Sequence, residues 1–167
     1  MKTKNCIPIL ALGIIAFGSC KPQPQQDQAT ATTTTTTTNN LPALSPADNK
    51  AIIAREISTW EFGKTRNFAG LREILANDYV GVFGKNILGP NDVVRTFEKS
   101  RVNMYRLSNI RVKPVTADVA IIYYNLMQDI LDENGSPWIP NVASTAVYVK
   151  RNNRWYNTYY TEIPLEQ

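Results

Sequence analysis

Four long runs of alternating residue types, separated by short turns, constrain the fold of this chain more than any other feature. The runs span residues 104–115, 119–131, 143–150 and 155–163. The pairs Asn134-Gly135 and Asn152-Asn153 separate two successive pairs of runs, and both tolerate the positive φ angles that tight hairpins need. The pattern therefore predicts an antiparallel meander, in which Pro137 and Pro140 lie in a loop, a bulge or an edge because proline cannot donate a ladder hydrogen bond.

The residues before these runs have helical signals instead. Ser45 can cap a helix, Pro46 suits its first position, and Asp48 supplies a carboxylate at N3, as in a capping box. The apolar face predicted for this helix consists of Ile53, Ile57 and Trp60, which recur at spacings of four and three.

Two more helices and a strand follow the first helix. Asn67 is the predicted cap of a short helix whose buried stripe is Phe68, Leu71, Ile74 and Leu75. Residues 79–83 are predicted to form a strand, 84–89 a turn, and 90–92 the start of a third helix with Val93, Val94 and Phe97 facing inward. The predicted fold class is α+β, with three N-terminal helices packed on a curved, mainly antiparallel sheet.

Composition excludes several kinds of chemistry. The 167 residues include no histidine and two cysteines, Cys6 and Cys20, both near the N-terminus. Histidine bases, Cys-His nucleophiles and ordinary zinc sites are therefore excluded from the folded part. A metal would need oxygen ligands, and the acidic group of Asp129, Asp132 and Glu133 lacks EF-hand spacing, so we predict a solvated turn, no metal and no cofactor.

Residues 1–19 have the features of an export signal. Lys2 and Lys4 precede an apolar stretch over residues 7–17, which is too short to span a bilayer. Gly18 and Ser19 then precede Cys20, a pattern that resembles the lipobox of bacterial lipoproteins, although Phe17 stands where Leu, Val or Ile is usual. The resemblance implies lipidation of Cys20 and membrane attachment; the alternative is an ordinary signal with an incidental cysteine.

Residues 20–44 are rich in Thr, Gln and Pro and lack apolar periodicity. We predict a disordered tether, or alternatively a glycosylated stalk or recognition tag. Lys21 does not resemble an inner-membrane retention signal, so we expect a cell-envelope protein at the outer membrane, facing the periplasm or, as the alternative, the external medium. From residue 45 onward there are 15 Lys/Arg and 13 Asp/Glu without a basic run, so nucleic acid is not an expected partner.

The domain from residue 45 to 167 resembles the nuclear transport factor 2-like superfamily, and within it the SnoaL-like, domain of unknown function 4440 type. The likeness depends on the helix that ends near Trp60, on residues 67–71, on 77–79 leading into a strand, and on 147–155. It implies a cone-shaped fold, an internal pocket, frequent homodimers, and functions that range from isomerases to assembly modules. Fold alone therefore leaves function open.

A ketosteroid-isomerase-like site in this superfamily uses a tyrosine and an aspartate base. Without gaps, these positions fall on Thr59 and Phe83, and residues 142–145 offer no late-strand carboxylate. Asp78 remains a weak candidate acid, although a solvated turn carboxylate explains it better. Glu56 and Glu61 are expected to be surface charges of the first helix.

Aromatic residues on the long runs suggest a ligand pocket. Strand alternation places Trp155, Asn157, Tyr159 and Thr161 on one face and Tyr156, Thr158, Tyr160 and Glu162 on the other. The hypothetical pocket consists of Trp60, Tyr79, Phe83, Tyr124, Asn157 and Tyr159. The opposite face could be a subunit interface, or both faces could simply fill the core and cover the sheet.

Three functional hypotheses follow. The first is a membrane-tethered, non-catalytic module that binds a small apolar ligand or supports assembly as a homodimer. The second is a pocket enzyme acting on a small apolar carbonyl or ring substrate. The third is an accessory lipoprotein that acts through a protein partner.

Overall fold

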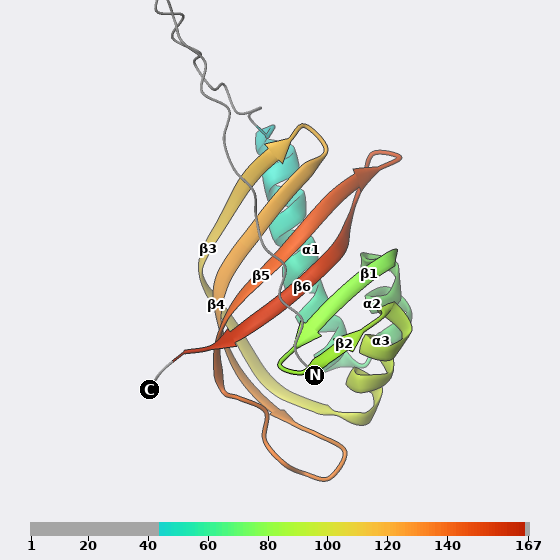
Figure 1. The fold of residues 1–167 in the computed structure, drawn as a ribbon, viewed down its shortest axis with the longest axis vertical. Helices are drawn as coiled ribbons and strands as arrows, with labels where there is room; N and C mark the ends of the chain where they lie inside the picture. The colour runs from blue at the N-terminus through green and yellow to red at the C-terminus, as the bar shows by residue number, and fades with distance from the viewer. Residues whose placement is uncertain (1–43, 166–167) are drawn as a thin grey trace, which may run out of the picture. The chain divides into compact units, whose positions relative to one another are not determined.

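A computed structural model describes residues 44–165, which form three helices and one six-stranded sheet. The strand order is β2-β1-β6-β5-β4-β3. All neighbouring strands are antiparallel except β1 and β6, which are parallel. The predicted class, helices packed on a curved and mainly antiparallel sheet, is confirmed (Figure 1). The predicted signal, Cys20 and almost all of the tether lie outside the described residues.

Helix α1 (Pro46–Thr65) begins as predicted. The Ser45 hydroxyl accepts from the backbone N–H of Asp48 at 3.0 Å and donates to the Asp48 carboxylate at 2.8 Å. Of the predicted apolar face, Trp60 is buried but Ile57 is 40% exposed. Ile52 and Glu56, which were not predicted, are completely buried. Helical spacing from Ile52 through Glu56 to Thr59 therefore defines the inner face, and an acidic residue occupies its centre.

The next elements pack together at one end of the sheet. Helix α2 (Phe68–Ile74) is capped by Asn67, whose side chain accepts from the Gly70 N–H at 3.0 Å. Strand β1 (Leu75–Phe83) begins four residues earlier than predicted, and a short strand β2 (Asn86–Leu88) lies within the predicted turn. Helix α3 (Pro90–Lys99) buries Val93 and Phe97, as expected.

The four long strands form the predicted meander. They are β3 (Arg101–Thr116), β4 (Val119–Leu131), β5 (Asn141–Arg151) and β6 (Arg154–Pro164). Both residues of the Asn152-Asn153 turn, and Gly135 in the preceding turn, have positive φ angles. Pro137 and Pro140 precede β5, in the loop. Figure 1 shows these strands curving alongside α1, so that the helix lies across their inner face.

Apolar residues from all these layers form one core between α1 and the sheet. Its completely buried members include Ile52, Leu71, Ile122, Val142 and Tyr148. No helix within residues 44–165 combines the length and apolar character needed to cross a bilayer. Toward α3 and β2 the core opens into a cavity.

Candidate functional site

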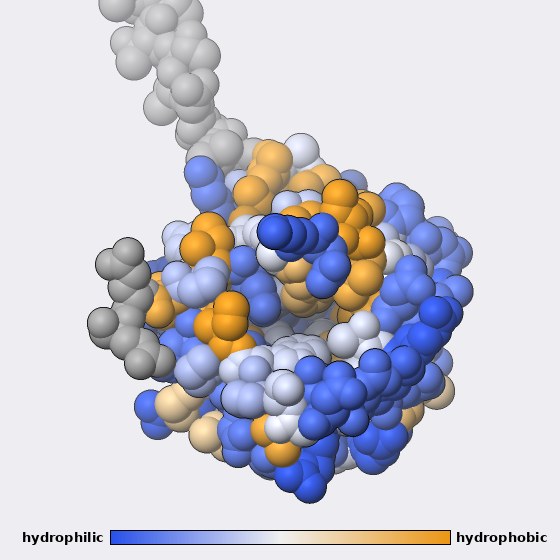
Figure 2. Space-filling view, turned by 60° about the horizontal axis from the view of Figure 1, so that its bottom comes forward, coloured by the Kyte–Doolittle hydropathy of each residue, from blue (hydrophilic) through white to orange (hydrophobic). Residues whose placement is uncertain are grey.

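The candidate site is a cavity of about 310 Å³ between α1, α3, β1, β2 and β6. Most of its wall is apolar. Six aromatic side chains contribute to it: Trp60, Tyr79, Phe83, Phe97, Trp138 and Tyr160. Figure 2 shows the hollow at this end of the domain, bordered by both apolar and polar residues. The size and the wall suit a small, mainly apolar molecule.

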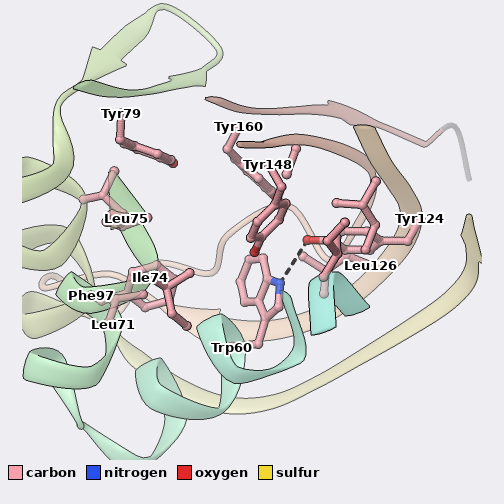
Figure 3. Packing of buried hydrophobic residues seen from close by; sticks show 14 of the residues in the cluster. Trp60, Leu71, Ile74, Leu75, Tyr79, Phe97, Tyr124, Leu126, Tyr148 and Tyr160 are labelled. Carbon is pink, nitrogen blue, oxygen red and sulfur yellow. Dashed lines mark hydrogen bonds between the residues drawn. The ribbon is translucent and has the colours of Figure 1, made fainter. Parts of the chain in front are cut away.

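Four of the six predicted pocket residues line this cavity. They are Trp60, Tyr79, Phe83 and Asn157. In Figure 3, Tyr79 extends from β1 toward the space that Trp60 and Tyr160 also face. Burial raises the pKa of the Tyr79 phenol, so this hydroxyl stays neutral. The predicted residues from α1, β1 and β6 are therefore brought together by the fold.

Tyr159 does not line the cavity, because β6 contains a bulge. Val147 pairs with Tyr159 while the next residue, Tyr148, pairs with Asn157, so Thr158 is left unpaired. An extra residue in a strand changes the sheet face to which each later side chain of that strand points. Asn157 and Tyr160 therefore both point inward, and Tyr159 points to the outer face. The strict alternation assumed from the sequence is wrong beyond Thr158.

The same bulge brings a carboxyl group into the cavity wall. Glu162, which alternation assigned to the opposite face from Asn157, lines the cavity with it. The Tyr160 hydroxyl donates to Glu162 at 2.9 Å and lies 2.9 Å from the Ser144 hydroxyl. Burial raises the pKa of Glu162, and the hydrogen bond from Tyr160 opposes this rise. The sequence analysis missed Glu162 as a site residue, since only the bulge reveals its direction.

Asn157 forms a second polar point, deeper in the cavity. The residue is 2% exposed, and its Oδ1 has no hydrogen-bond partner among the described residues. An unpaired buried polar atom costs about 1–3 kcal/mol. A ligand group that donates to this oxygen would recover part of that cost, so Asn157 has the character of a ligand-orienting residue.

Behind the wall lies a buried polar cluster that the sequence analysis also missed. Glu56 is completely buried and accepts from Tyr124 at 2.5 Å and from Tyr148 at 2.7 Å. The Trp60 indole N–H donates to the Tyr124 hydroxyl at 3.0 Å, as Figure 3 shows. Burial raises the pKa of Glu56, and these tyrosine hydrogen bonds oppose the rise. Glu56 is thus not the surface charge that was expected.

Tyr124 belongs to this cluster rather than to the cavity. It is 2% exposed and is absent from the cavity wall, so its predicted pocket role is wrong. Its phenol is turned toward Glu56 on α1, and Trp60 separates it from the space. Glu61, by contrast, is an exposed residue that accepts from the Tyr105 hydroxyl at 2.8 Å.

Asp78, the weak catalytic candidate, points away from the cavity. Its side chain is 62% exposed and forms a bidentate pair with Arg151, at 2.9 and 2.7 Å. The Arg151 guanidinium lowers the pKa of Asp78, which keeps the carboxylate ionised on the surface. Asp78 is not among the residues that line the cavity, so it cannot act there as an acid.

The two positions that the superfamily resemblance assigned to catalysis do reach the cavity. Thr59 and Phe83 both line it. The Thr59 hydroxyl donates to the Arg55 carbonyl at 3.1 Å, and Phe83 carries no ionisable group. Neither supplies a tyrosine-like acid or a base at its position.

The acidic turn after β4 is explained by local hydrogen bonds. The Asp132 carboxylate accepts from the backbone N–H groups of Asn134 and Ser136, both at 2.8 Å. Glu133 forms an ion pair with Lys99 at 2.8 Å. Within the part of the chain that the structure describes, no group of three potential ligands comes together for a metal ion.

Comparison with known proteins shows which proteins this domain is similar to. Residues 91–162 match the family model of the calcium/calmodulin dependent protein kinase II association domain. Comparison with curated protein sequences finds no match.

Solved structures resemble most of the chain at low identity. An NTF2-like protein from Cytophaga hutchinsonii has a TM-score of 0.65 and 9% identity, covering 70% of this chain and 98% of its own. The association domain of the C. elegans kinase has a TM-score of 0.56 and 14% identity, covering 70% and 95%. A hexachlorocyclohexane dehydrochlorinase from Novosphingobium barchaimii has a TM-score of 0.57 and 17% identity, covering 70% and 86%.

Together these likenesses show the fold of the domain, a cone-shaped α+β fold. The domain of this chain has the nuclear transport factor 2-like fold, as the sequence resemblance implied. Proteins of this fold include both enzymes and association domains, so the role of this one depends on its own cavity.

Proposed function

We propose that this protein is a lipid-anchored protein of the bacterial cell envelope whose domain binds a small, mainly apolar molecule. The observation that carries the proposal is the aromatic cavity of about 310 Å³, whose wall includes the polar residues Asn157 and Glu162. Apolar walls with a few placed polar groups are typical of small-molecule sites.

The anchor is proposed from the sequence. Cys20 follows an export signal in a lipobox-like context, and the threonine-rich residues after it would let the domain stand away from the membrane. Acyl chains on Cys20 would hold the protein firmly, because stable anchoring needs two membrane signals and a triacylated cysteine exceeds that. The outer membrane, on its periplasmic side, is the proposed location.

Labelling with radioactive palmitate in the producing bacterium tests the anchor. Wild-type protein and the matched control Cys6→Ala should both take up label, because Cys6 lies inside the predicted signal. Cys20→Ala should take up none. Label on the Cys20→Ala variant would contradict the proposal.

Binding of a neutral aromatic probe tests the cavity. 3-Phenylpropan-1-ol, followed by calorimetry with the purified protein, should bind wild type. Thr96→Trp should weaken binding, because Thr96 lies in the cavity wall on α3. Glu98→Trp, at an exposed position two residues later, is the control. Equal binding by both variants, or none by wild type, would contradict the proposal.

A second candidate function, an enzyme acting in the same cavity, is favoured by the Glu162–Tyr160 pair. A partly buried carboxyl group with a raised pKa is suited to proton transfer. Its substrate would be a small apolar carbonyl or ring compound. Turnover that Glu162→Gln abolishes while leaving substrate binding intact would support this function over binding alone.

We also propose that the protein forms a homodimer through the outer face of its sheet. Adjacent residues on β4, β5 and β6 there form a largely apolar row, Ile121, Val147 and Tyr159, which pair across the strands. Beside it Tyr123 is 44% exposed. Tyrosine and aliphatic side chains gathered on an open sheet face are typical of subunit interfaces. A protein partner instead of a second copy is the remaining alternative.

A further inference from the structure

We propose that the cavity selects ligands that carry a positively charged ammonium group next to an apolar body, with the cation held at Glu162. This inference rests on the proposed binding function and names the chemical class of its ligand. It follows from the charge of the wall, the position of Glu162 and the rings beside it.

The only charged side chain among the described residues of the cavity wall is acidic. Among the described residues that line it, Glu162 is the only ionisable group other than tyrosine, and neither Lys nor Arg contributes. This contrasts with the domain as a whole, which has 15 basic and 13 acidic residues. A carboxylate ligand would meet no counter-charge in the wall, whereas a cation would.

Glu162 is held in place for such a contact. Its Oε2 accepts from the Tyr160 hydroxyl at 2.9 Å, and that hydroxyl lies 2.9 Å from the Ser144 hydroxyl on the neighbouring strand. The hydrogen bond from Tyr160 occupies Oε2 and leaves Oε1 of Glu162 available to a ligand, since Oε1 has no hydrogen-bond partner among the described residues. A hydrogen bond between ions of opposite charge is about twice as strong as one between neutral groups.

Aromatic rings flank the carboxyl group. The Phe83 and Tyr160 rings lie 5.3 Å apart, and the parallel register that pairs Val82 with Thr161 places Phe83 beside Glu162. Ring faces attract cations, and more strongly where water is excluded. A carboxylate with adjacent rings is thus a suitable setting for an ammonium group, and it discriminates against an anion.

The different depths of Asn157 and Glu162 in the cavity indicate how such a ligand would lie. Asn157 precedes Glu162 by five residues on β6, roughly 15 Å along an extended strand. Asn157 is 2% exposed whereas Glu162 is half-buried, so Glu162 lies nearer the mouth. The apolar body would then enter between Trp60, Tyr79 and Phe97, with the cation outermost.

Three probes of the same size and different charge test the inference by calorimetry. They are 3-phenylpropylammonium, 3-phenylpropan-1-ol and 3-phenylpropanoate. We expect the cation to bind at least tenfold more tightly than the alcohol, and the anion to bind most weakly. Equal affinities for cation and alcohol would overturn the inference and leave the proposed binding function intact. Binding of none of the three would overturn both.

A pair of matched variants tests whether Glu162 causes the preference for the cation over the alcohol. Glu162→Gln should remove the tenfold advantage of the cation over the alcohol while the alcohol still binds. Glu61→Gln is the control, because Glu61 also accepts from a tyrosine hydroxyl, that of Tyr105, but does not line the cavity. A cation preference that survives Glu162→Gln would overturn the assignment. The probe series on wild type decides the question even if Glu162→Gln does not fold.

Discussion

The Tyr148 hydroxyl on β5 donates to Oε2 of Glu56 on α1 at 2.7 Å, across 92 residues of sequence. Both side chains are completely buried. The second oxygen of Glu56 accepts from Tyr124, so each oxygen of this buried carboxyl group has a hydrogen-bond donor from the sheet. This contact connects the helix to the sheet directly behind the cavity wall formed by Thr59 and Trp60.

Tyr148→Phe should lower the free energy of unfolding by about 1–3 kcal/mol, because it removes one donor and leaves a buried carboxyl oxygen without a partner. Urea unfolding at constant pH measures the change. Tyr123→Phe, which alters a 44% exposed tyrosine, is the control and should change stability by less than about 0.5 kcal/mol. Equal effects of the two variants would show that the Glu56 contact adds nothing to stability.

The raised pKa of Glu56 predicts how stability depends on pH. Burial raises the pKa in the folded state above the ordinary value of 4.5, so the folded protein binds more protons than the unfolded chain over this interval. This group therefore makes the free energy of unfolding fall as pH rises above about 4.5, until the folded-state pKa is passed. Glu162 contributes in the same direction.

Glu56→Gln should accordingly flatten the pH dependence of stability on the neutral side of about pH 4.5. Urea unfolding at a series of pH values, compared with wild type, measures the difference in slope. Glu162→Gln gives the contribution of the second carboxyl group separately. A slope unchanged in Glu56→Gln would mean that Glu56 has the same pKa in the folded and unfolded states.

Local signals were sufficient to predict most of the fold. The Ser45 cap, the Asn67 cap and the Asn152-Asn153 turn each act through neighbouring backbone groups, so the residues that form them lie within a few positions of each other. The alternating runs likewise predict long strands, since period two is a property of a single strand.

The site was less predictable, because the directions in which its side chains point depend on contacts with residues distant in the sequence. Glu56 looks like a surface charge in a helical pattern, and only Tyr124 and Tyr148, which lie 68 and 92 residues away, explain its burial. Strict alternation predicts the wrong face for Tyr160 and Glu162, because nothing in the sequence around Thr158 indicates a bulge. The pairing of β6 with β5 creates that bulge, and pairing is a tertiary property.

Gly81→Ala should deform the cavity, because a Cβ at this position would lie 2.5 Å from the Phe83 ring and 2.7 Å from the Tyr79 hydroxyl. Both side chains line the cavity and would have to move. We expect a loss of stability of about 1–3 kcal/mol and weaker binding of 3-phenylpropan-1-ol. Gly89→Ala is the control, since its nearest neighbour would lie at an ordinary 3.6 Å. Unchanged probe affinity in Gly81→Ala would contradict the placement of the site.

The outer face of the sheet gives the last prediction. Val147 is half-buried at the centre of the row formed with Ile121 and Tyr159, so a charge there would be desolvated if a second copy covered it. Val147→Glu should convert a dimer into a folded monomer, as measured by analytical ultracentrifugation and circular dichroism. Asp118→Lys, in the exposed turn between β3 and β4, changes charge away from this face and should leave the dimer intact. A wild-type protein that is monomeric at all concentrations would refute the homodimer, and an unchanged dimer in Val147→Glu would place its interface elsewhere.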